Sequence, residues 1–315
     1  MITGHDLDEL GPPPPAGSVV SIGVFDGVHL GHQAILAANV ARARECGAAP
    51  TVVTFAEHPK RVLLGLAPRT LTTLEHRLEL FRRAGIERAL ALRFDEELRS
   101  VSAEEFVERI LVRGLAARAF VLGFDSKFGR ERRGTPAFLS AMGFDVTVVE
   151  KVQVGQRAVS STAIREAVEL GDLEGAASML GRSVSVLGEV VHGDALGRQL
   201  GFPTANLDLH HELHPPPGVY FGWAGLYAAG RVEHCFGAVA NIGFRPTLRG
   251  PGGERPRVEI HLLDFKGDLY GSQIEMVFLG RLRGEQRFPD LEALKAQIGR
   301  DVAQARERLA QAARG

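Results

Sequence analysis

Two histidines three positions apart, His29 and His32, stand in a short glycine-rich segment between two apolar stretches. The first stretch, residues 19–24, is typical of a buried strand, and the apolar spacing after Gly31 predicts a helix that begins almost at once. Glycine lets backbone amides approach a ligand closely, and a helix N-terminus offers unpaired N–H groups and a partial positive charge. Because both imidazoles would stand at that helix start, we expect them to donate to the same phosphate oxygens.

A lone glycine-rich turn with one histidine is usually structural, but that explanation is weak for a strand, the string FDGVHLGH and a helix in this order. The string resembles the HxGH signature of nucleotidyltransferases. Its longer form, GxFDGxHxGHQ, resembles the family of bifunctional bacterial riboflavin kinase/FAD synthetases. The resemblance implies catalytic roles for His29 and His32. It implies that the nucleotide-binding residues of this segment are Gly23, Phe25, Asp26, Gly27 and Gly31.

The composition is that of an ordinary globular chain: 315 residues, 45% hydrophobic and 24% charged, with a formal net charge of -1. This balance gives no whole-chain basic footprint for nucleic acid. Cys46 and Cys235 lie far apart and outside any CxxC, which argues against a disulfide framework or a zinc site. Residues 1–9 lack the apolar core of a signal peptide, and no apolar run is long enough to span a membrane. We therefore expect a soluble cytoplasmic protein with one large or two ordinary domains.

Strands and helices alternate through the first half of the chain. Capping boxes open two of the predicted helices, at Thr72 and at Ser102. Further buried strands are predicted at residues 51–55, 88–94, 119–122 and 145–149. Such alternation favours a parallel sheet with helices on both faces, and the resemblance implies a Rossmann-like nucleotidyltransferase domain.

Ligands of such sheets gather at the carboxyl ends of the strands, so the loops FDGVHLGH, AEHP and GFDSKFG should share one crevice. The resemblance implies flavin binding there by His58, Asp125 and Phe128. Two positions depart from the family pattern: Glu57 stands in a TFEPHP-like motif, and Ser126 stands where an aromatic often follows. Weaker flavin affinity follows from a lost stacking surface, and a chain that keeps only its kinase activity remains an alternative.

Residues 159–165, VSSTAIR, place three hydroxyls and an arginine at the start of a predicted helix. An N-cap with a surface arginine and a second phosphate-binding site are equally good interpretations of this pattern. The segment resembles the ISSTxIR motif of the family, which implies nucleotide binding by Ser160, Ser161, Thr162 and Arg165. A short helix at 172–180 stops at Gly181, and we expect the domain boundary next to it, giving domains 1–182 and 183–315.

Strand signals without long helices follow, at residues 184–191, 219–226, 233–239, 257–263 and 274–279. Short strands at this spacing, separated by turn residues such as those at 249–253, predict a small antiparallel β-barrel. Asp290 is a plausible N-cap for a final amphipathic helix that should pack on the barrel. The two halves show no internal repeat, so we expect two different folds.

A second glycine-rich segment, residues 192–206, is not a Walker loop, and from its spacing an anion-binding loop and a structural turn are equally supported. It resembles the riboflavin kinase signature GRxxGFPTAN, as do residues 218–220, 241–247 and 259–265. The resemblance implies that Thr204 and Asn206 hold Mg²⁺ and that Glu259 is the catalytic base. It implies nucleotide binding by Gly193, Gly197, Arg198, Gly201, Pro203 and Asn241. Without the family, Glu259 would be an ordinary strand carboxylate, and strand alternation places it toward the barrel mouth.

The resemblance spans residues 19–306 and implies an enzyme that phosphorylates riboflavin to FMN and adenylylates FMN to FAD. It would use ATP and Mg²⁺ at both sites and need no nucleic acid, membrane or obligate protein partner. Two alternatives stay open: a flavin-sensing regulator that acts through nucleic acid, and an adenylyltransferase for another small phosphate.

Overall fold

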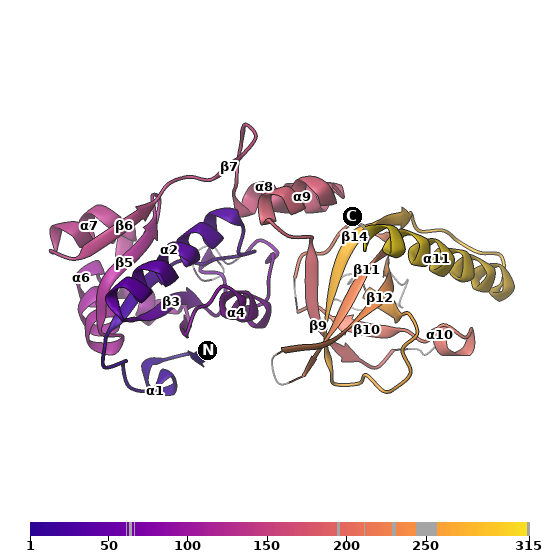
Figure 1. Ribbon diagram of the computed structural model, residues 1–315, viewed down its shortest axis with the longest axis horizontal. Coiled ribbons are helices and arrows are strands. Elements are labelled where there is room, and N and C mark those ends of the chain that lie inside the picture. The colour runs from indigo at the N-terminus through magenta and orange to yellow at the C-terminus, as the bar shows by residue number, and fades with distance from the viewer. Residues whose placement is uncertain are drawn as a thin grey trace. The chain divides into compact units, whose positions relative to one another are not determined.

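The computed structural model describes residues 1–60, 62, 65, 67–193, 196–210, 212–228, 231–243 and 257–313. The chain forms two compact units, Met1–Ser161 and Thr162–Gly315 (Figure 1). This division places α8 (Ser161–Leu170) almost entirely, and α9 (Leu173–Leu180) fully, with the second unit, so the boundary expected near residue 182 stays a prediction. The segments at 194–195, 245–247 and 249–253, which carry parts of two motifs and one predicted turn, lie outside the described residues.

The first unit contains a six-stranded sheet in the order β1-β4-β3-β2-β5-β6, with every neighbouring pair parallel. Its strands are β1 (Ile2–Gly4), β2 (Ser18–Ile22), β3 (Ala49–Phe55), β4 (Arg88–Leu92), β5 (Ala117–Gly123) and β6 (Asp145–Val149). The five predicted strands are confirmed. The additional edge strand, β1, has only three residues, which is too short to show a periodic pattern.

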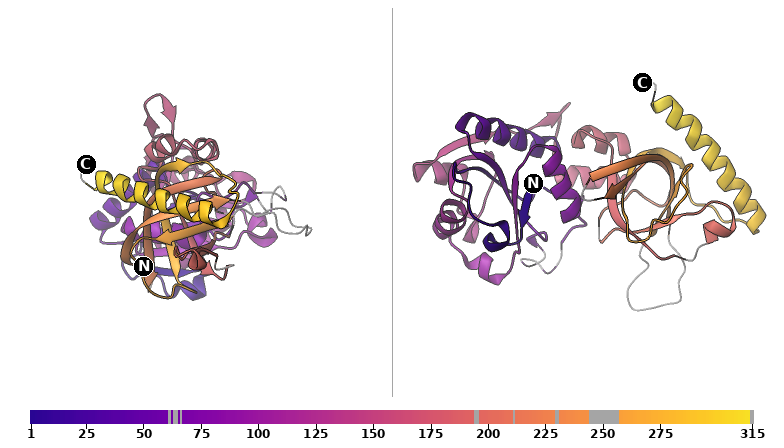
Figure 2. Two further views of the ribbon diagram at one scale, coloured as in Figure 1. Left: turned by 90° about the vertical axis from the view of Figure 1, so that its right-hand side faces the viewer. Right: turned by 60° about the horizontal axis from the view of Figure 1, so that its bottom comes forward.

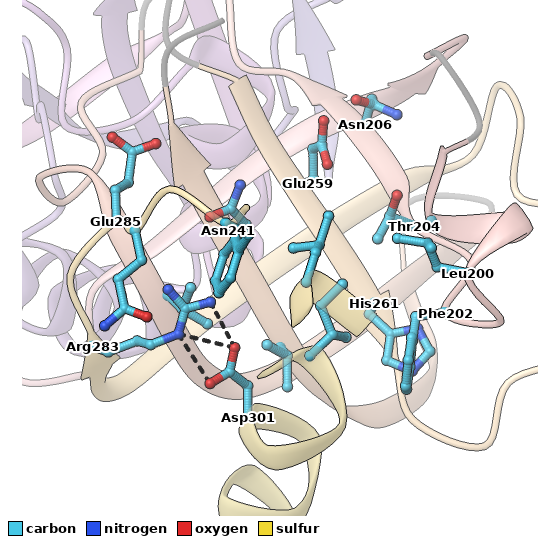
Figure 3. Close-up of a pocket in the computed structure, with 17 residues that line it drawn as sticks. Leu200, Phe202, Thr204, Asn206, Asn241, Glu259, His261, Arg283, Glu285 and Asp301 are labelled. Atoms are coloured by element: carbon cyan, nitrogen blue, oxygen red, sulfur yellow. Dashed lines mark hydrogen bonds and ion pairs between the residues drawn. The ribbon is translucent and has the colours of Figure 1, made fainter. Parts of the chain in front are cut away.

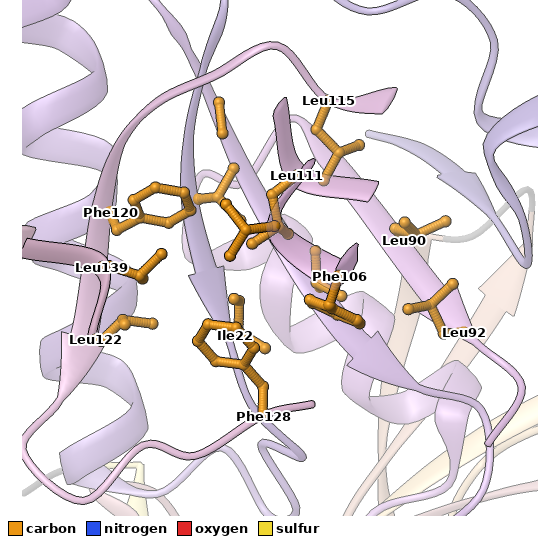
Figure 4. Close-up of a cluster of buried hydrophobic side chains, with 14 of the residues drawn as sticks. Ile22, Leu90, Leu92, Phe106, Leu111, Leu115, Phe120, Leu122, Phe128 and Leu139 are labelled. Atoms are coloured by element: carbon orange, nitrogen blue, oxygen red, sulfur yellow. The ribbon is translucent and has the colours of Figure 1, made fainter. Parts of the chain in front are cut away.

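Helices cover both faces of this sheet. One core packs the π-helix η1 (Phe106–Gly114) and α7 (Pro136–Ala141) against residues such as Ile22 and Phe120 (Figure 4). The other packs α2 (Leu30–Cys46) and α4 (Leu74–Arg83) against the opposite face. The remaining short elements are α1 (Leu7–Leu10), α5 (Glu96–Ser100), α6 (Ala103–Glu105), η2 (Arg130–Arg132) and the pair β7 (Gln153–Val154) and β8 (Arg157–Ala158).

Side-chain caps fix the helix starts. The Ser102 side chain accepts from the Glu105 amide at 3.0 Å, which confirms that capping box. The prediction for Thr72 is wrong by one residue, because Thr73 is the N-cap of α4 and accepts from the His76 amide at 3.2 Å. Both hydroxyls fit a capping pattern, and the tertiary contacts of Thr72 described below decide between them.

The second unit is a closed barrel in the order β10-β13-β12-β11-β14-β9, with all pairs antiparallel. Its strands are β9 (Ser185–Val191), β10 (Ala205–Asp208), β11 (Gly218–Ala228), β12 (Arg231–Gly243), β13 (Arg257–Leu262) and β14 (Gln273–Arg283). The predicted barrel is confirmed, and β10 is the strand that the sequence pattern missed.

The helix α11 (Leu291–Ala312) lies outside the barrel, as the right-hand view of Figure 2 shows. Asp290 caps it as predicted, accepting from the Ala293 amide at 2.8 Å. Apolar residues of α11, including Ala305 and Leu309, pack on Val219 and Val239 of the barrel wall. A short helix, α10 (Leu196–Gln199), lies in the second glycine-rich segment. None of the helices in the described parts of the chain is long and apolar enough to cross a membrane.

Candidate active sites

The two histidines of the first glycine-rich segment lie together at the N-terminus of α2. His29 is the N-cap residue, and its Nδ1 accepts from the His32 amide at 3.3 Å. The two rings stack with centroids 3.6 Å apart, and the edge of Phe25 meets His32 at 5.1 Å. Because Nδ1 of His29 is an acceptor, a neutral His29 ring carries its proton on Nε2 and can donate it. The imidazoles and the backbone amides at the start of the 17-residue helix α2 are therefore of the kinds that suit an anion.

The turn before this helix has a strained backbone. Phe25, Gly27 and Val28 have φ values of 52°, 80° and 39°. A Cβ on Gly27 would lie 2.7 Å from the Leu71 side chain, so glycine is required there for two reasons. Such conformations persist only when the surroundings hold them, and they concentrate at functional sites.

Thr72 supplies part of that support. Its Oγ1 accepts from the Gly27 amide at 3.0 Å. The buried Asp26 carboxylate accepts in turn from the amides of Leu71 at 2.9 Å and Thr72 at 3.1 Å. Asp26, predicted to bind nucleotide, is thus seen bracing the turn against the segment before α4.

The hydroxyl-rich motif meets the turn through Ser161, whose Oγ donates to the Asp26 carbonyl at 3.0 Å. Ser160 belongs to the same unit and is half-buried. Thr162 and Arg165 fall in the second unit, so their nucleotide contacts stay a prediction.

Beside the turn, a cavity of about 720 Å³ opens at the carboxyl ends of the strands. Its lining includes His58 and Phe128 as predicted, whereas the predicted Asp125 is exposed and is not one of the described residues that line it. Further aromatic walls come from Phe55, Phe94 and Phe106; Phe55 meets Phe94 edge-on at 5.6 Å. Basic residues outnumber acidic ones in the lining: Lys60, Arg99, Lys127, Arg130 and Arg132 stand against Glu96, which pairs with Arg99 at 3.0 Å, and Glu131. These walls suit a flat, apolar ring system that carries an anionic group.

Phe94 was not predicted as a site residue because the predicted strand 88–94 included it, whereas β4 ends at Leu92. The basic residues of the cavity were not predicted either. Their sequence signal is a pair of arginines, Arg130 and Arg132, that stand two and four positions after Phe128 at the end of a strand–loop motif.

In the barrel, three polar side chains form a row across neighbouring strands. Glu259 of β13 is the direct partner of Asn206 on β10 and of Asn241 on β12. Residues directly opposite in a sheet share a face, and Figure 3 shows Glu259 between the two asparagines. This row lines a cavity of about 360 Å³ together with Thr204.

The cavity lies on the outer face of the barrel wall. Val258 and Ile260, the neighbours of Glu259, are fully buried on the opposite face, while Val239 and Val219 share its face and pack on α11. The expectation that Glu259 faces the barrel mouth is therefore wrong. Alternation separates the two faces of a strand, but it does not say which one a helix will cover.

The segment around Thr204 is held by short contacts. The Phe202 amide donates to the Gly197 carbonyl at 2.8 Å, and a Cβ on Gly197 would lie 2.4 Å from the Phe202 carbonyl oxygen. Nδ1 of His261 bonds the Pro203 carbonyl at 2.8 Å. Thr204 lines both the cavity described above and a second one of about 250 Å³. Thr204 therefore lies in the wall that separates the two cavities.

The second cavity is lined by the basic side chains of Arg198 and Lys266 and by Tyr270, whose ring stacks on His192 with centroids 3.9 Å apart. Among the predicted nucleotide residues, Arg198 and Pro203 line this smaller cavity, Gly197 and Asn241 line the larger one, and Gly193 and Gly201 line neither. Gly193 instead packs against Asn206, since a Cβ there would lie 2.0 Å from Nδ2.

The donors around Thr204 suit a hard cation. Within the described ranges no group of three or more His, Cys, Asp or Glu side chains could hold a metal. Oδ1 of Asn206, however, is buried and has no hydrogen-bond partner in the described part of the chain. A buried acceptor of this kind beside a threonine hydroxyl fits Mg²⁺, which prefers oxygen ligands and keeps several waters.

An ion pair that the sequence analysis did not predict closes another part of the larger cavity (Figure 3). Arg283 donates to both carboxylate oxygens of Asp301, at 3.0 and 2.8 Å, and Gln297 donates to Asp301 at 2.8 Å. The guanidinium also lies over the Phe288 ring, 5.7 Å from its centroid. Because its partner lies on α11, this pair ties the helix to β14.

Known proteins match both units. The family described as FAD synthetase matches residues 12–163, and the family described as riboflavin kinase matches residues 180–309. Bifunctional riboflavin kinase/FMN adenylyltransferases are similar along nearly the whole chain. The protein from Pseudomonas fluorescens is 43% identical (93% of this chain, 94% of its own), and that from Bacillus subtilis is 36% identical (92% of each).

A solved structure from Streptococcus pneumoniae, named a macrolide-efflux protein, superposes with a TM-score of 0.80 at 31% identity, covering 97% of this chain and 99% of that one. Both units and their order are thus shared with known proteins. The chain belongs to the family of bifunctional riboflavin kinase/FMN adenylyltransferases.

Proposed function

We propose that this chain phosphorylates riboflavin to FMN in its barrel unit and converts FMN to FAD in its sheet unit, with ATP as the donor in both reactions. The observation that carries the proposal is that one chain holds both sites. Stacked histidines at a helix N-terminus stand beside an aromatic cavity with basic residues in its walls. In the barrel, Thr204, Asn206 and Glu259 line one cavity, and Thr204 also lines a second.

In the barrel, the smaller, basic cavity suits ATP and the larger one suits riboflavin. The ribityl 5′-hydroxyl attacks the γ-phosphorus, the bond to the β-phosphate oxygen breaks, and ADP leaves. Glu259 takes the proton of the alcohol, and Asn241 and Asn206 on either side orient the reacting groups. Thr204 Oγ1 and Asn206 Oδ1 would hold Mg²⁺, which when bound neutralises charge on the phosphates.

In the sheet unit, an oxygen of the FMN phosphate attacks the α-phosphorus of ATP, and pyrophosphate leaves. The nucleophile is already anionic, so no general base is required. His29, His32 and the amides at the start of α2 donate to phosphate oxygens as charge accumulates on them. The aromatic cavity holds the isoalloxazine ring, and its cations face the flavin phosphate.

The alternative of a chain with kinase activity alone rested on Glu57 and Ser126. Glu57 is exposed and lies outside the described lining of the flavin cavity. Phe55, Phe94, Phe106 and Phe128 provide aromatic surface without an aromatic at position 126. These observations favour a working FAD synthetase.

The proposed compartment is the cytoplasm. Both cysteines are free and exposed, which suits a reducing environment, and ATP is the common substrate.

The direct test is to incubate the protein with riboflavin, ATP and Mg²⁺ and to separate the flavins by chromatography. We expect FMN first and FAD later, and FAD alone when FMN is supplied instead of riboflavin. Accumulation of FMN without FAD would establish the kinase-only alternative. Flavin binding without consumption of ATP would establish a sensor.

A further inference from the structure

A buried arginine lies beneath the first site. Arg77 of α4 is only 3% exposed. Its guanidinium donates to the carbonyl of Val24 at 2.5 Å, to that of Phe55 at 3.1 Å and to Oγ1 of Thr54 at 3.5 Å. Val24 directly precedes the strained turn and Phe55 ends β3, so one side chain joins the ends of two strands.

No carboxylate forms an ion pair with Arg77 in the described part of the chain, and its Nε is buried without a hydrogen-bond partner there. Burial lowers the pKa of this guanidinium, and the more distant Asp26 and Glu75 carboxylates only partly offset that effect. A charge removed from water is costly when only neutral carbonyl and hydroxyl oxygens accept its hydrogen bonds and no carboxylate pairs with it.

The two carbonyls that Arg77 holds belong to both halves of the site. Val24 and Phe55 line the flavin cavity, and Val24 also leads into the turn that carries His29. The positive charge of Arg77 is thus fixed next to the place where the triphosphate of ATP and the phosphate of FMN must meet.

A second buried arginine shows that this position is particular. Arg88, at the start of β4, is 7% exposed, and its guanidinium likewise donates to carbonyls, those of Leu10, Gly11 and Pro12, at 2.9, 3.3 and 3.0 Å. Because the strands are parallel, Arg88 lies at the amino edge of the sheet, whereas Arg77 serves its carboxyl edge. Both arginines are buried and donate to backbone carbonyls, but their contacts lie at opposite edges of the sheet.

We propose that Arg77 is a positioning residue for adenylyl transfer: its buried guanidinium locks the phosphate turn to the wall of the flavin cavity and provides positive charge behind both that no ion pair neutralises in the described part of the chain. This role deepens, and rests on, the assignment of adenylyl transfer to the sheet unit. Wild-type protein that makes no FAD would overturn that assignment before Arg77 is tested.

The first experiment compares Arg77→Met with Arg88→Met, each assayed for FAD formation from FMN and for FMN formation from riboflavin. Misplacement of a reacting group costs about 10²-fold in rate, and we expect a loss of that size in kcat/KM for FAD formation with Arg77→Met only. Calorimetric titration with pyrophosphate should show weakened binding in the same variant. FMN formation reports on folding within each molecule, and thermal unfolding measures the stability lost in each.

The second experiment uses Arg77→Lys, which keeps a charge that can titrate. Burial lowers the pKa of a lysine, so at this position the charge should disappear as pH rises. FAD formation by the variant, divided by that of wild type, should then fall with rising pH. This ratio removes the contributions of the other groups on the turn and α4 that change charge with pH, namely Asp26, His29, His32, Glu75, His76 and Glu79, which both proteins carry.

Stability separates the two possible roles. A lysine whose folded-state pKa is lowered makes the folded protein more stable as pH rises, because the unfolded chain binds more protons. If Arg77 only holds the fold, FAD formation by Arg77→Lys should improve with pH together with stability. The proposal also fails if Arg77→Met and Arg88→Met lose FAD formation equally, or if pyrophosphate binding is unchanged in Arg77→Met.

Discussion

The two sites of this chain take their functional groups from different parts of the structure. The sheet unit uses backbone amides and imidazoles at a helix start, presented by a turn with three residues at positive φ. The barrel unit uses side chains that are direct cross-strand partners on three neighbouring strands, Asn206, Glu259 and Asn241. A site built on a turn depends on the contacts that brace it, whereas a site built on a closed barrel inherits its geometry from the strand ladder.

This difference fits the two reactions. Transfer to an alcohol needs a group that accepts a proton, and the barrel supplies Glu259 in a fixed place. Transfer to a phosphate needs only donors for the spreading charge, which a helix N-terminus provides. Because both activities reside in one chain, each serves as the folding control for variants of the other.

The largest effect is expected for Glu259→Gln. General bases contribute about 10²–10⁴-fold to rate, so FMN formation should fall by that factor while FAD formation from FMN stays at the wild-type level. Steady-state assays with each flavin check this. Glu285→Gln, which alters an exposed carboxylate of the same cavity, is the matched control and should leave kcat nearly unchanged. Equal losses in both variants would show that Glu259 is not the base.

His32→Ala should come next. Loss of one charge-stabilising donor commonly costs about 10²–10³-fold in kcat, and FAD formation should fall by that amount with FMN formation intact. The alanine also removes the ring that stacks on His29 at 3.6 Å, so His32→Gln, which keeps a donor, should recover part of the rate. A loss of FMN formation equal to that of FAD formation would contradict separate sites.

Phe94→Ala tests whether Phe94 provides the aromatic contact with the flavin that Ser126 does not provide. Aromatic pairs contribute about 0.5–1.5 kcal/mol beyond the buried area, so we expect the KM for FMN to rise about tenfold with kcat less affected. Phe144→Ala is the control, because Phe144 packs edge-on against Phe120 at 5.3 Å in the core and does not line the cavity. An unchanged KM would remove Phe94 from the flavin site.

Local sequence patterns were sufficient to predict the elements whose structure is determined by neighbouring residues. The Ser102 and Asp290 caps, the stop at Gly181 and five of the six strands of the sheet all follow from sequence periodicity and capping chemistry. They could be predicted because each depends on residues within one or two turns.

The features that the sequence did not predict are determined by tertiary contacts. In sequence, Thr72 and Thr73 are equally good candidates for the N-cap of α4. In the structure Thr72 accepts from the Gly27 amide, and Thr73 caps the helix. The four-residue β10 carries the polar Asn206 and forms because β9 and β13 pair with it on both sides. Arg77 resembles any surface arginine of an amphipathic helix in sequence, and only the fold shows that it is buried under two strand ends.

The smallest expected effect is on the pH dependence of the sheet unit. Burial of Glu79 on α4 raises the pKa of its carboxyl, but hydrogen bonds from Arg82 and Arg83 outweigh this, and the pKa lies below its usual range. A lowered folded-state pKa means stability that is present above the unfolded-state pKa and lost as pH falls through the folded-state value. Acid should therefore loosen α4, and with it Arg77 and the turn that Arg77 holds. Glu79→Gln should make thermal stability less dependent on pH in the acidic range. FAD and FMN formation are measured after brief acid exposure. If wild-type protein loses both activities in parallel, the turn is no more sensitive to acid than the barrel.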